Sequence, residues 1–284
     1  MSFCADVKNE ICSHKATSRC CRKAECAGIY LGAKKKKNGN ITFKTSNQEV
    51  ACLIEKCFER HLGECVVQIS RNGSYNLEFS SGDGYFEFSD ISNVFEKECC
   101  RASFVRGSFL ICGQLTNPGA NYRLDFNLRA EESAQLLYTA LNEAGFSPRL
   151  SVKSSGYATV YFKNSNEIED LLTYMGATLS TLDLMEVKVE KDYKNHLNRT
   201  VNFETANYVR SYSTGAAQVR AINRLQQCGI LSTLSPELID AAKLRLDNPD
   251  ASLATLSSLS GVSKSGLNHR LNKIMELAKK AGEY

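Results

Sequence analysis

The sequence predicts an α+β protein, in which an N-terminal domain of two α/β repeats, related by a pseudo-twofold axis, precedes an all-α C-terminal domain. Two stretches of the same character, "CCRKAECAGIYLGAK" (20–34) and "CCRASFVRGSFLICG" (99–113), open an internal repeat. The last strand pattern ends near residue 162, and beyond residue 195 the net charge becomes positive. The expected boundaries are one domain at 1–195, with repeats at about 20–98 and 99–190, and a second domain at 196–284.

The first repeat begins with a helix expected over about 20–33. Asn38-Gly39 then turns a hairpin, and a second hairpin turns at Asn72-Gly73. Between the hairpins lies a helix whose apolar residues have helical spacing: Val50, Leu53, Ile54, Cys57, Phe58 and Leu62. The stretch "DISNVFEKEC" (90–99) is expected as a closing helix.

The second repeat has the same order. A helix near 100–112 leads into a hairpin that turns at Asn117-Pro118-Gly119. The next helix points its apolar residues inward: Leu136, Leu137, Ala140, Leu141 and Ala144. A hairpin turning at Ser155-Gly156 and the helix "NEIEDLLTYMGA" (166–177) complete the copy. Each copy is therefore helix, hairpin, helix, hairpin and helix.

Small residues mark one face of the first helix of each repeat. Ala24, Gly28 and Gly32 lie four apart, as do Ser103 and Gly107, and this spacing places each set on one helix face. Glycine costs a helix roughly 1 kcal/mol relative to alanine. We therefore predict that the two helices pack on each other with their backbones in close contact, and that the hairpins of both copies form one curved sheet.

Two glycine-faced helices at the seam of two such halves resemble the LAGLIDADG homing endonuclease fold. On that motif 26–34 reads "CAGIYLGAK" and 105–113 reads "VRGSFLICG". The resemblance implies a catalytic metal-binding acid at the penultimate position, which here holds Ala33 and Cys112. Because magnesium needs oxygen ligands, and two-metal cleavage needs them from both helices, we expect the fold without a catalytic residue or enzyme activity.

The run Lys34–Lys37 falls on the first hairpin, where the resembling endonucleases lay DNA on their sheet. It could contact phosphates. Lysines also protect an edge strand from pairing with another chain, and we slightly favour this second interpretation.

The 12 cysteines are expected as reduced thiols in the cytoplasm, because no export signal or membrane span is recognisable. Cys20, Cys21 and Cys26 cluster in the sequence, and Cys52, Cys57 and His61 could converge on zinc. Neither set has the paired short spacing of a structural zinc site, so we favour small core residues and expect no metal or cofactor.

The C-terminal third holds the whole positive excess. Residues 1–195 hold 24 Lys and Arg against 24 Asp and Glu, whereas residues 196–284 hold 11 against 7. The polar stretch "EKDYKNHLNR" (190–199) is expected as a linker or domain edge. A mainly helical segment follows and stops at Gly229, and Ser235, Pro236 and Asn248-Pro249 bound a further helix.

The segment 251–280 has the pattern of a helix-turn-helix. Ser252 caps a short helix, Gly261 turns the chain, and Ser263 caps a second helix. The second helix turns inward the apolar residues Leu267, Leu271, Ile274 and Leu277. Polar and cationic residues that can reach bases or phosphates remain for DNA: Ser263, Lys264, Ser265, Asn268, His269, Arg270 and Lys273. Ser257 stands where alanine is commoner, and an ordinary helical hairpin is the alternative.

A degenerate LAGLIDADG-like domain followed by a helix-turn-helix resembles the WhiA family. The strongest points are "NRTVNFETAN" (198–207), "AAKLRLDNPDASLATL" (241–256) and "VSKSGLNHRLNKI" (262–274), and the opening "SFCADVKNEI" is similar too. The resemblance implies a nucleoid-associated regulator that binds double-stranded DNA and acts in cell division and chromosome segregation, or in sporulation where the host sporulates. Alternatives are a division-linked scaffold, with a protein partner on the N-terminal domain, and an active endonuclease.

Overall fold

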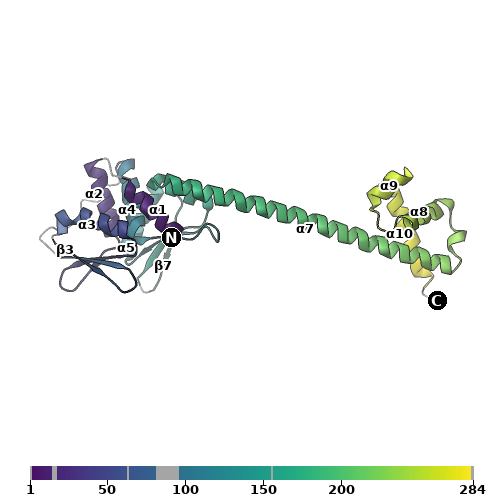
Figure 1. Cartoon of the computed structure of the whole chain (residues 1–284), viewed down its shortest axis with the longest axis horizontal. Coiled ribbons are helices and arrows are strands. Elements are labelled where there is room, and N and C mark those ends of the chain that lie inside the picture. Colours follow the sequence, from purple (N-terminus) through teal and green to yellow (C-terminus); the bar gives the residue numbers. More distant parts are fainter. Residues whose placement is uncertain (1, 15–17, 63, 81–95, 155, 283–284) are drawn as a thin grey trace. The chain divides into compact units, whose positions relative to one another are not determined.

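The computed structural model describes residues 2–14, 18–62, 64–80, 96–154 and 156–282 (Figure 1). The chain divides into two compact units, Met1–Lys191 and Asp192–Tyr284. In the first unit, the first repeat contains α2 (Arg19–Tyr30), β1 (Lys34–Lys35), β2 (Ile41–Thr45), α3 (Gln48–Leu62), β3 (Cys65–Ile69) and β4 (Tyr75–Phe79). The second repeat contains α4 (Glu98–Cys112), β5 (Gly113–Leu115), β6 (Leu124–Leu128), α5 (Glu131–Glu143), β7 (Arg149–Val152), β8 (Ala158–Phe162) and α6 (Ser165–Met175).

The two repeats share one strand topology. The strands form two antiparallel four-stranded sheets, ordered β1-β2-β4-β3 and β5-β6-β8-β7. The two central strands of each sheet pair apolar residues in register. Phe43 lies opposite Leu77 in the first sheet, and Phe126 lies opposite Val160 in the second. These four side chains are almost completely buried, so each sheet turns one face to the helices. The repeat predicted from the sequence is confirmed.

The expectation of one curved sheet is wrong. The strands β1 and β5, of two and three residues, are each the edge of their own sheet, and no pairing joins them among the described residues. Each follows directly on the end of a seam helix, α2 or α4, so each repeat builds its own sheet outward from its helix. The closing helix expected at 90–99 lies, up to residue 95, outside the described residues, as does Ser155.

The helices α2 and α4 meet backbone to backbone, as their small residues predict. A Cβ added to Gly28 would lie 2.1 Å from the carbonyl oxygen of Phe104, and one added to Gly107 would lie 2.1 Å from the carbonyl oxygen of Glu25. Each glycine therefore meets the residue three positions before the other, which is the mark of a pseudo-twofold axis. No side chain larger than hydrogen fits at either position.

A buried ion pair crosses the same seam. Arg106 Nε of α4 lies 2.8 Å from Glu25 Oε1 of α2, and the two side chains are 11% and 6% exposed. Burial raises the pKa of Glu25, and the charge of Arg106 opposes that shift. Removing one partner would leave the other charge buried without compensation, so the pair favours this one pairing of the helices.

A helix that the sequence did not predict opens the chain. The helix α1 (Phe3–Ser13) is capped by Ser2 and buries Val7 and Ile11. Its Glu10 carboxylate accepts hydrogen bonds from the backbone N–H groups of Leu179 and Ser180, at 2.7 and 2.9 Å. An acid at that place satisfies donors at the start of α7 (Thr178–Gln227) and complements its dipole.

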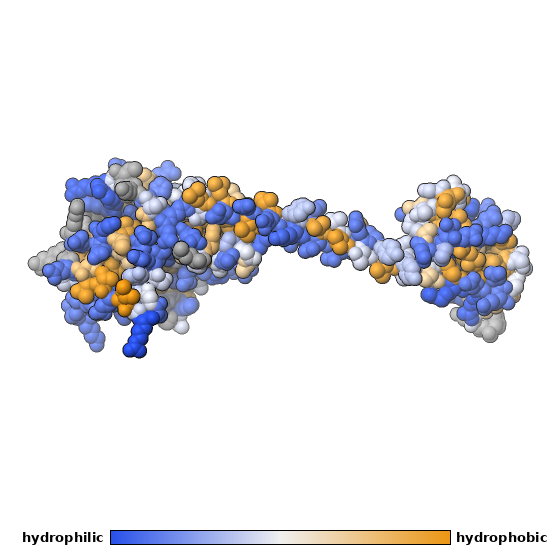
Figure 2. Space-filling model, in the orientation of Figure 1, coloured by the Kyte–Doolittle hydropathy of each residue, from blue (hydrophilic) through white to orange (hydrophobic). Residues whose placement is uncertain are grey.

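The stretch at 190–199 lies within α7, so it is not a linker, but the boundary between the two compact units falls in it, after Lys191, as expected of a domain edge. It contains no proline or glycine to end a helix. Val189, Tyr193, Leu197 and Val201 lie four apart, which is helical spacing that continues through the polar residues. These four side chains are at least half exposed, and Figure 2 shows apolar side chains on the surface of α7.

The second unit packs the end of α7 against three helices, α8 (Pro236–Asp247), α9 (Leu253–Ser260) and α10 (Lys264–Lys280). Its core is apolar and comprises Ile222, Leu225, Leu238, Ala241, Ala242, Leu256, Leu267, Leu271, Ile274 and Ala278. None of the described helices is both long and apolar enough to cross a membrane.

We predict that Gly107→Ala destabilises the first unit. A single methyl group would overlap the Glu25 carbonyl, and overpacking a fixed core costs about 1–3 kcal/mol or more. The melting temperature should fall by several degrees. Ala102→Leu is the control, because it adds more atoms to the same helix at a half-buried position. Equal melting temperatures for the two variants would remove the case for a glycine seam.

Candidate nucleic-acid interface

The helices α9 and α10 are bounded by the residues that the sequence indicates. Ser252 Oγ accepts a hydrogen bond from the N–H of Thr255 at 3.1 Å, and Ser263 Oγ accepts one from the N–H of Gly266 at 3.2 Å. Gly261 turns the chain between them with a φ of 68°, in the left-handed region that favours glycine. The segment therefore has a helix, a glycine turn and a capped second helix.

Ser257 forms a hydrogen bond across this turn. Its hydroxyl donates a hydrogen bond of 2.6 Å to the carbonyl of Val262, the residue after Gly261. An alanine at this position would leave that carbonyl without this donor. The departure from the commoner residue therefore stabilises the angle between α9 and α10.

Arg245 of α8 supports the same segment, and the sequence did not single it out. The residue is 2% exposed, and its Nη1 donates to the carbonyls of Asn248, Pro249 and Ala251, the last at 2.6 Å. Burial lowers the pKa of this guanidinium. These carbonyls belong to the loop that ends α8 and leads into α9, so Arg245 fixes the start of the helix-turn-helix.

The expected site residues share one end and one side of α10, with one exception. Those that lie exposed are Ser263, Lys264, Ser265, Asn268, His269 and Lys273. Arg270 is half-buried instead, and its Nη2 lies 3.5 Å from Glu237 Oε2 of α8. Asn272 is exposed and one turn beyond Asn268, and its four-residue spacing is the signal that would have found it.

The electrostatics of α10 favour an anion at its start. Its first turn contains Lys264 and no acid, and the positive end of the helix dipole adds to that charge. The N–H groups of a helix start can bind a phosphate, and amide side chains can read base edges in the major groove. The face from Ser265 to Lys273 thus combines donors for phosphates and for bases.

A second basic surface lies in the first unit, at the ends of α2 and α4. A cavity of about 330 Å³ is lined by Gly32, Lys34, Lys36, Thr42, Lys44, Asn76, Ile111, Cys112, Asn127 and Arg129. Both sheets contribute, and no carboxylate is among these lining residues. Burial raises the pKa of Cys112 to about 12, and Lys36 pairs with Glu78 at 2.6 Å. The strand that carries Lys34 is an edge strand, as the lysine run indicates.

Family models match most of this arrangement. A model described as the WhiA C-terminal HTH domain matches residues 197–278, and one described as the WhiA LAGLIDADG-like domain matches residues 101–194. The first match contains α8, α9 and nearly all of α10, and the second contains the second repeat from Arg101 of α4 onward.

Similar proteins span nearly the full chain. The "Probable cell division protein WhiA" of Caldicellulosiruptor saccharolyticus is 30% identical over 98% of this chain and 95% of its own length. The protein of the same description from Clostridium botulinum is 30% identical, over 98% of both chains. That of Desulforudis audaxviator is 32% identical, over 98% of this chain and 97% of its own.

Two solved structures have a similar fold. Full-length DUF199/WhiA from Thermatoga maritima matches with a TM-score of 0.62 and 23% identity, over 100% of both chains. The N-terminal LAGLIDADG domain of DUF199/WhiA matches with a TM-score of 0.52 and 21% identity, over 62% of this chain and 90% of that one. At these identities the likeness concerns the fold alone.

We predict that Arg245→Met destabilises the second unit. It removes a buried donor to three loop carbonyls, and leaving such acceptors unsatisfied costs about 1–3 kcal/mol. Amide hydrogen exchange on the full chain should show faster exchange in α8, α9 and α10. Lys243→Met is the matched control, because Lys243 is exposed on the same helix. Equal exchange in both variants would contradict the role given to Arg245.

Proposed function

This chain belongs to the WhiA family, and we propose that it is a regulator that binds specific sequences of double-stranded DNA and acts in cell division. The observation that carries the proposal is the capped, cationic start of α10, with an exposed polar face, in a region that matches an HTH model. The relatives are described as probable cell division proteins, and this supports the cellular process. The finer proposal is that it regulates transcription, with effects on chromosome segregation, or on sporulation in a host that sporulates, and that it works on the nucleoid in the cytoplasm.

In the proposed mode of recognition, some residues of α10 contact phosphates and others contact bases. Its first turn meets a phosphate through the N–H groups after Ser263, and Lys264 and Lys273 make further phosphate contacts that position the helix. Asn268 reads adenine through two hydrogen bonds in the major groove, with Ser265, His269 and Asn272 beside it. Arg270 contributes less than its charge suggests, because Glu237 already partners it.

The residues of the chain fit two other functions less well, an active endonuclease and a division-linked scaffold. An active endonuclease needs carboxylates at the ends of α2 and α4, where Ala33 and Cys112 stand instead. A division-linked scaffold would use the first unit to bind a protein and would contact DNA incidentally. The concentration of positive charge in the C-terminal third favours the DNA-binding regulator.

We predict that substitutions on α10 separate affinity from specificity. The preferred site is first identified by genome-wide mapping of bound DNA. Asn268→Ala should then weaken the binding free energy by about 1–3 kcal/mol on that site and change it little on random DNA. Lys273→Ala should weaken binding to both DNAs alike. It should also flatten the slope of log binding constant against log salt concentration by the amount expected for about one counterion. Fluorescence anisotropy across a salt series measures both effects.

The control for this experiment is Lys56→Ala, which removes an equal charge from an exposed position on α3. It should leave binding unchanged. If instead Lys34→Ala and Lys44→Ala abolish binding while Asn268→Ala leaves specificity intact, the DNA site lies at the cavity of the first unit. Binding to all sequences with equal affinity would favour the scaffold.

We also predict that the protein does not cut DNA. Supercoiled DNA incubated with the full chain and magnesium should stay intact on a gel, because neither Ala33 nor Cys112 offers an oxygen ligand. Nicking that co-purifies with the protein and is lost in Cys112→Ala would overturn the alignment of the motif and restore the enzyme class.

A further inference from the structure

Cysteine pairs stand at the start of both seam helices. Cys20 and Cys21 begin α2, and Cys99 and Cys100 begin α4. The sequence offset between the pairs equals the offset from Gly28 to Gly107, so the pseudo-twofold axis of the seam relates them. The sequence grouped Cys20 and Cys21 with Cys26, but the structure places them against α4, whereas the Cys26 thiol faces the Cys57 carbonyl.

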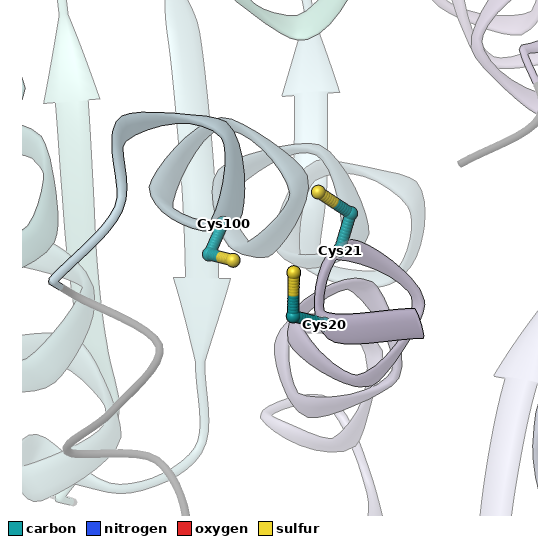
Figure 3. Close-up of side chains that lie close together, drawn as sticks. All are labelled: Cys20, Cys21 and Cys100. Atoms are coloured by element: carbon teal, nitrogen blue, oxygen red, sulfur yellow. The ribbon is translucent and has the colours of Figure 1, made fainter. Parts of the chain in front are cut away.

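Three of these thiols converge on one point. The Sγ atoms of Cys20, Cys21 and Cys100 all lie within 4.8 Å of one another, and Figure 3 shows them directed into the space between the two helices. In the part of the chain that the structure describes, no other three His, Cys, Asp or Glu side chains meet this criterion. Zinc–sulfur bonds of about 2.3 Å in a tetrahedron place sulfurs about 3.8 Å apart, so a contraction of about 1 Å is enough.

The cluster is closed toward the core and open to solvent. Cys21 and Cys100 are 5% and 2% exposed, whereas Cys20 and Cys99 are exposed. The backbone carbonyl of Cys99 accepts a hydrogen bond from the Cys21 thiol at 3.6 Å, but the Cys99 sulfur is not one of the three that converge. Exposed cysteines do not fill a core, and the explanation of these four as small core residues therefore fails for Cys20 and Cys99.

The surroundings favour negative charge. The contacts Cys21–Cys99 at one end and Gly32–Ile111 at the other show that α2 and α4 run parallel, so their positive ends adjoin at the cysteines. The Ser18 Oγ atom lies 3.0 Å from the Cys20 Sγ atom, within hydrogen-bond distance.

We propose that Cys20, Cys21 and Cys100 form a zinc site that joins the two repeats at the open end of the glycine seam, with a fourth ligand supplied from the solvent side. Three thiolates and one further ligand suit tetrahedral zinc, and binding converts each thiol to a thiolate with release of its proton. Because α2 supplies two of these ligands and α4 supplies one, the ion holds together the starts of α2 and α4. The site is independent of DNA binding by α10.

The test uses the full chain, reduced, stripped with a chelator and exchanged into metal-free buffer. Zinc alone is titrated by calorimetry, and cobalt(II) is titrated in parallel, since its thiolate charge-transfer and d–d bands report a tetrahedral sulfur site. We expect one ion per chain and a rise in melting temperature with zinc. Cys20→Ser should weaken zinc binding at least tenfold and reduce the charge-transfer intensity. Because Cys20 is exposed, this variant should fold.

Cys228→Ser is the matched control, because Cys228 is an exposed cysteine in the second unit. It should bind zinc as the unmodified chain does. The proposal is overturned if the reduced protein takes up no zinc, or if Cys20→Ser and Cys228→Ser bind it equally. A Cys20–Cys100 disulfide in protein purified without reductant, together with no zinc uptake after reduction, would assign the cluster to redox chemistry instead.

Discussion

The backbone contact between α2 and α4 is the constraint on which the first unit depends. Gly28 and Gly107 let two parallel helices approach until a carbonyl of one occupies the place of a side chain of the other. Each strand system then leaves its own helix end and builds its own sheet. The same contact brings the cysteine pairs together at the helix starts and closes the basic cavity at the helix ends, so both surfaces are consequences of one approach.

Parallel packing also explains the charges at the two ends of the seam. Adjoining helix starts present two positive dipole ends, and three thiols converge there. Adjoining helix ends present two negative dipole ends, and there the cavity is lined by Lys34, Lys36, Lys44 and Arg129. Cations at that place stabilise the helix pair whether or not they meet a phosphate. Their presence alone is therefore weak evidence for nucleic acid.

Local patterns in the sequence predicted what depends on local chemistry. Glycine spacing gave the seam, Ser252, Gly261 and Ser263 gave the helix-turn-helix, and turn residues gave the hairpins. The features that the sequence did not predict depend on contacts between residues far apart in the sequence. The partner of Cys20 is Cys100, and the partner of Arg270 is Glu237, and neither pairing has a local signature. The helix through 190–199 was not predicted for another reason, because composition outweighed a four-residue apolar spacing that was present, although the unit boundary does fall in this stretch.

The two units are shaped by different interactions, a glycine seam in the first and side-chain hydrogen bonds to loop carbonyls in the second. The seam positions that would hold catalytic acids carry Ala33 and Cys112, yet the glycines that shape the seam are retained. Since glycine weakens a helix, only the packing of α2 on α4 offsets that cost. The two glycines therefore serve the close approach of the helices. In the second unit, Arg245 and Ser257 donate part-buried hydrogen bonds to the loop before α9 and to the turn before α10. This arrangement fixes the direction of α10, which is what a helix that reads DNA requires.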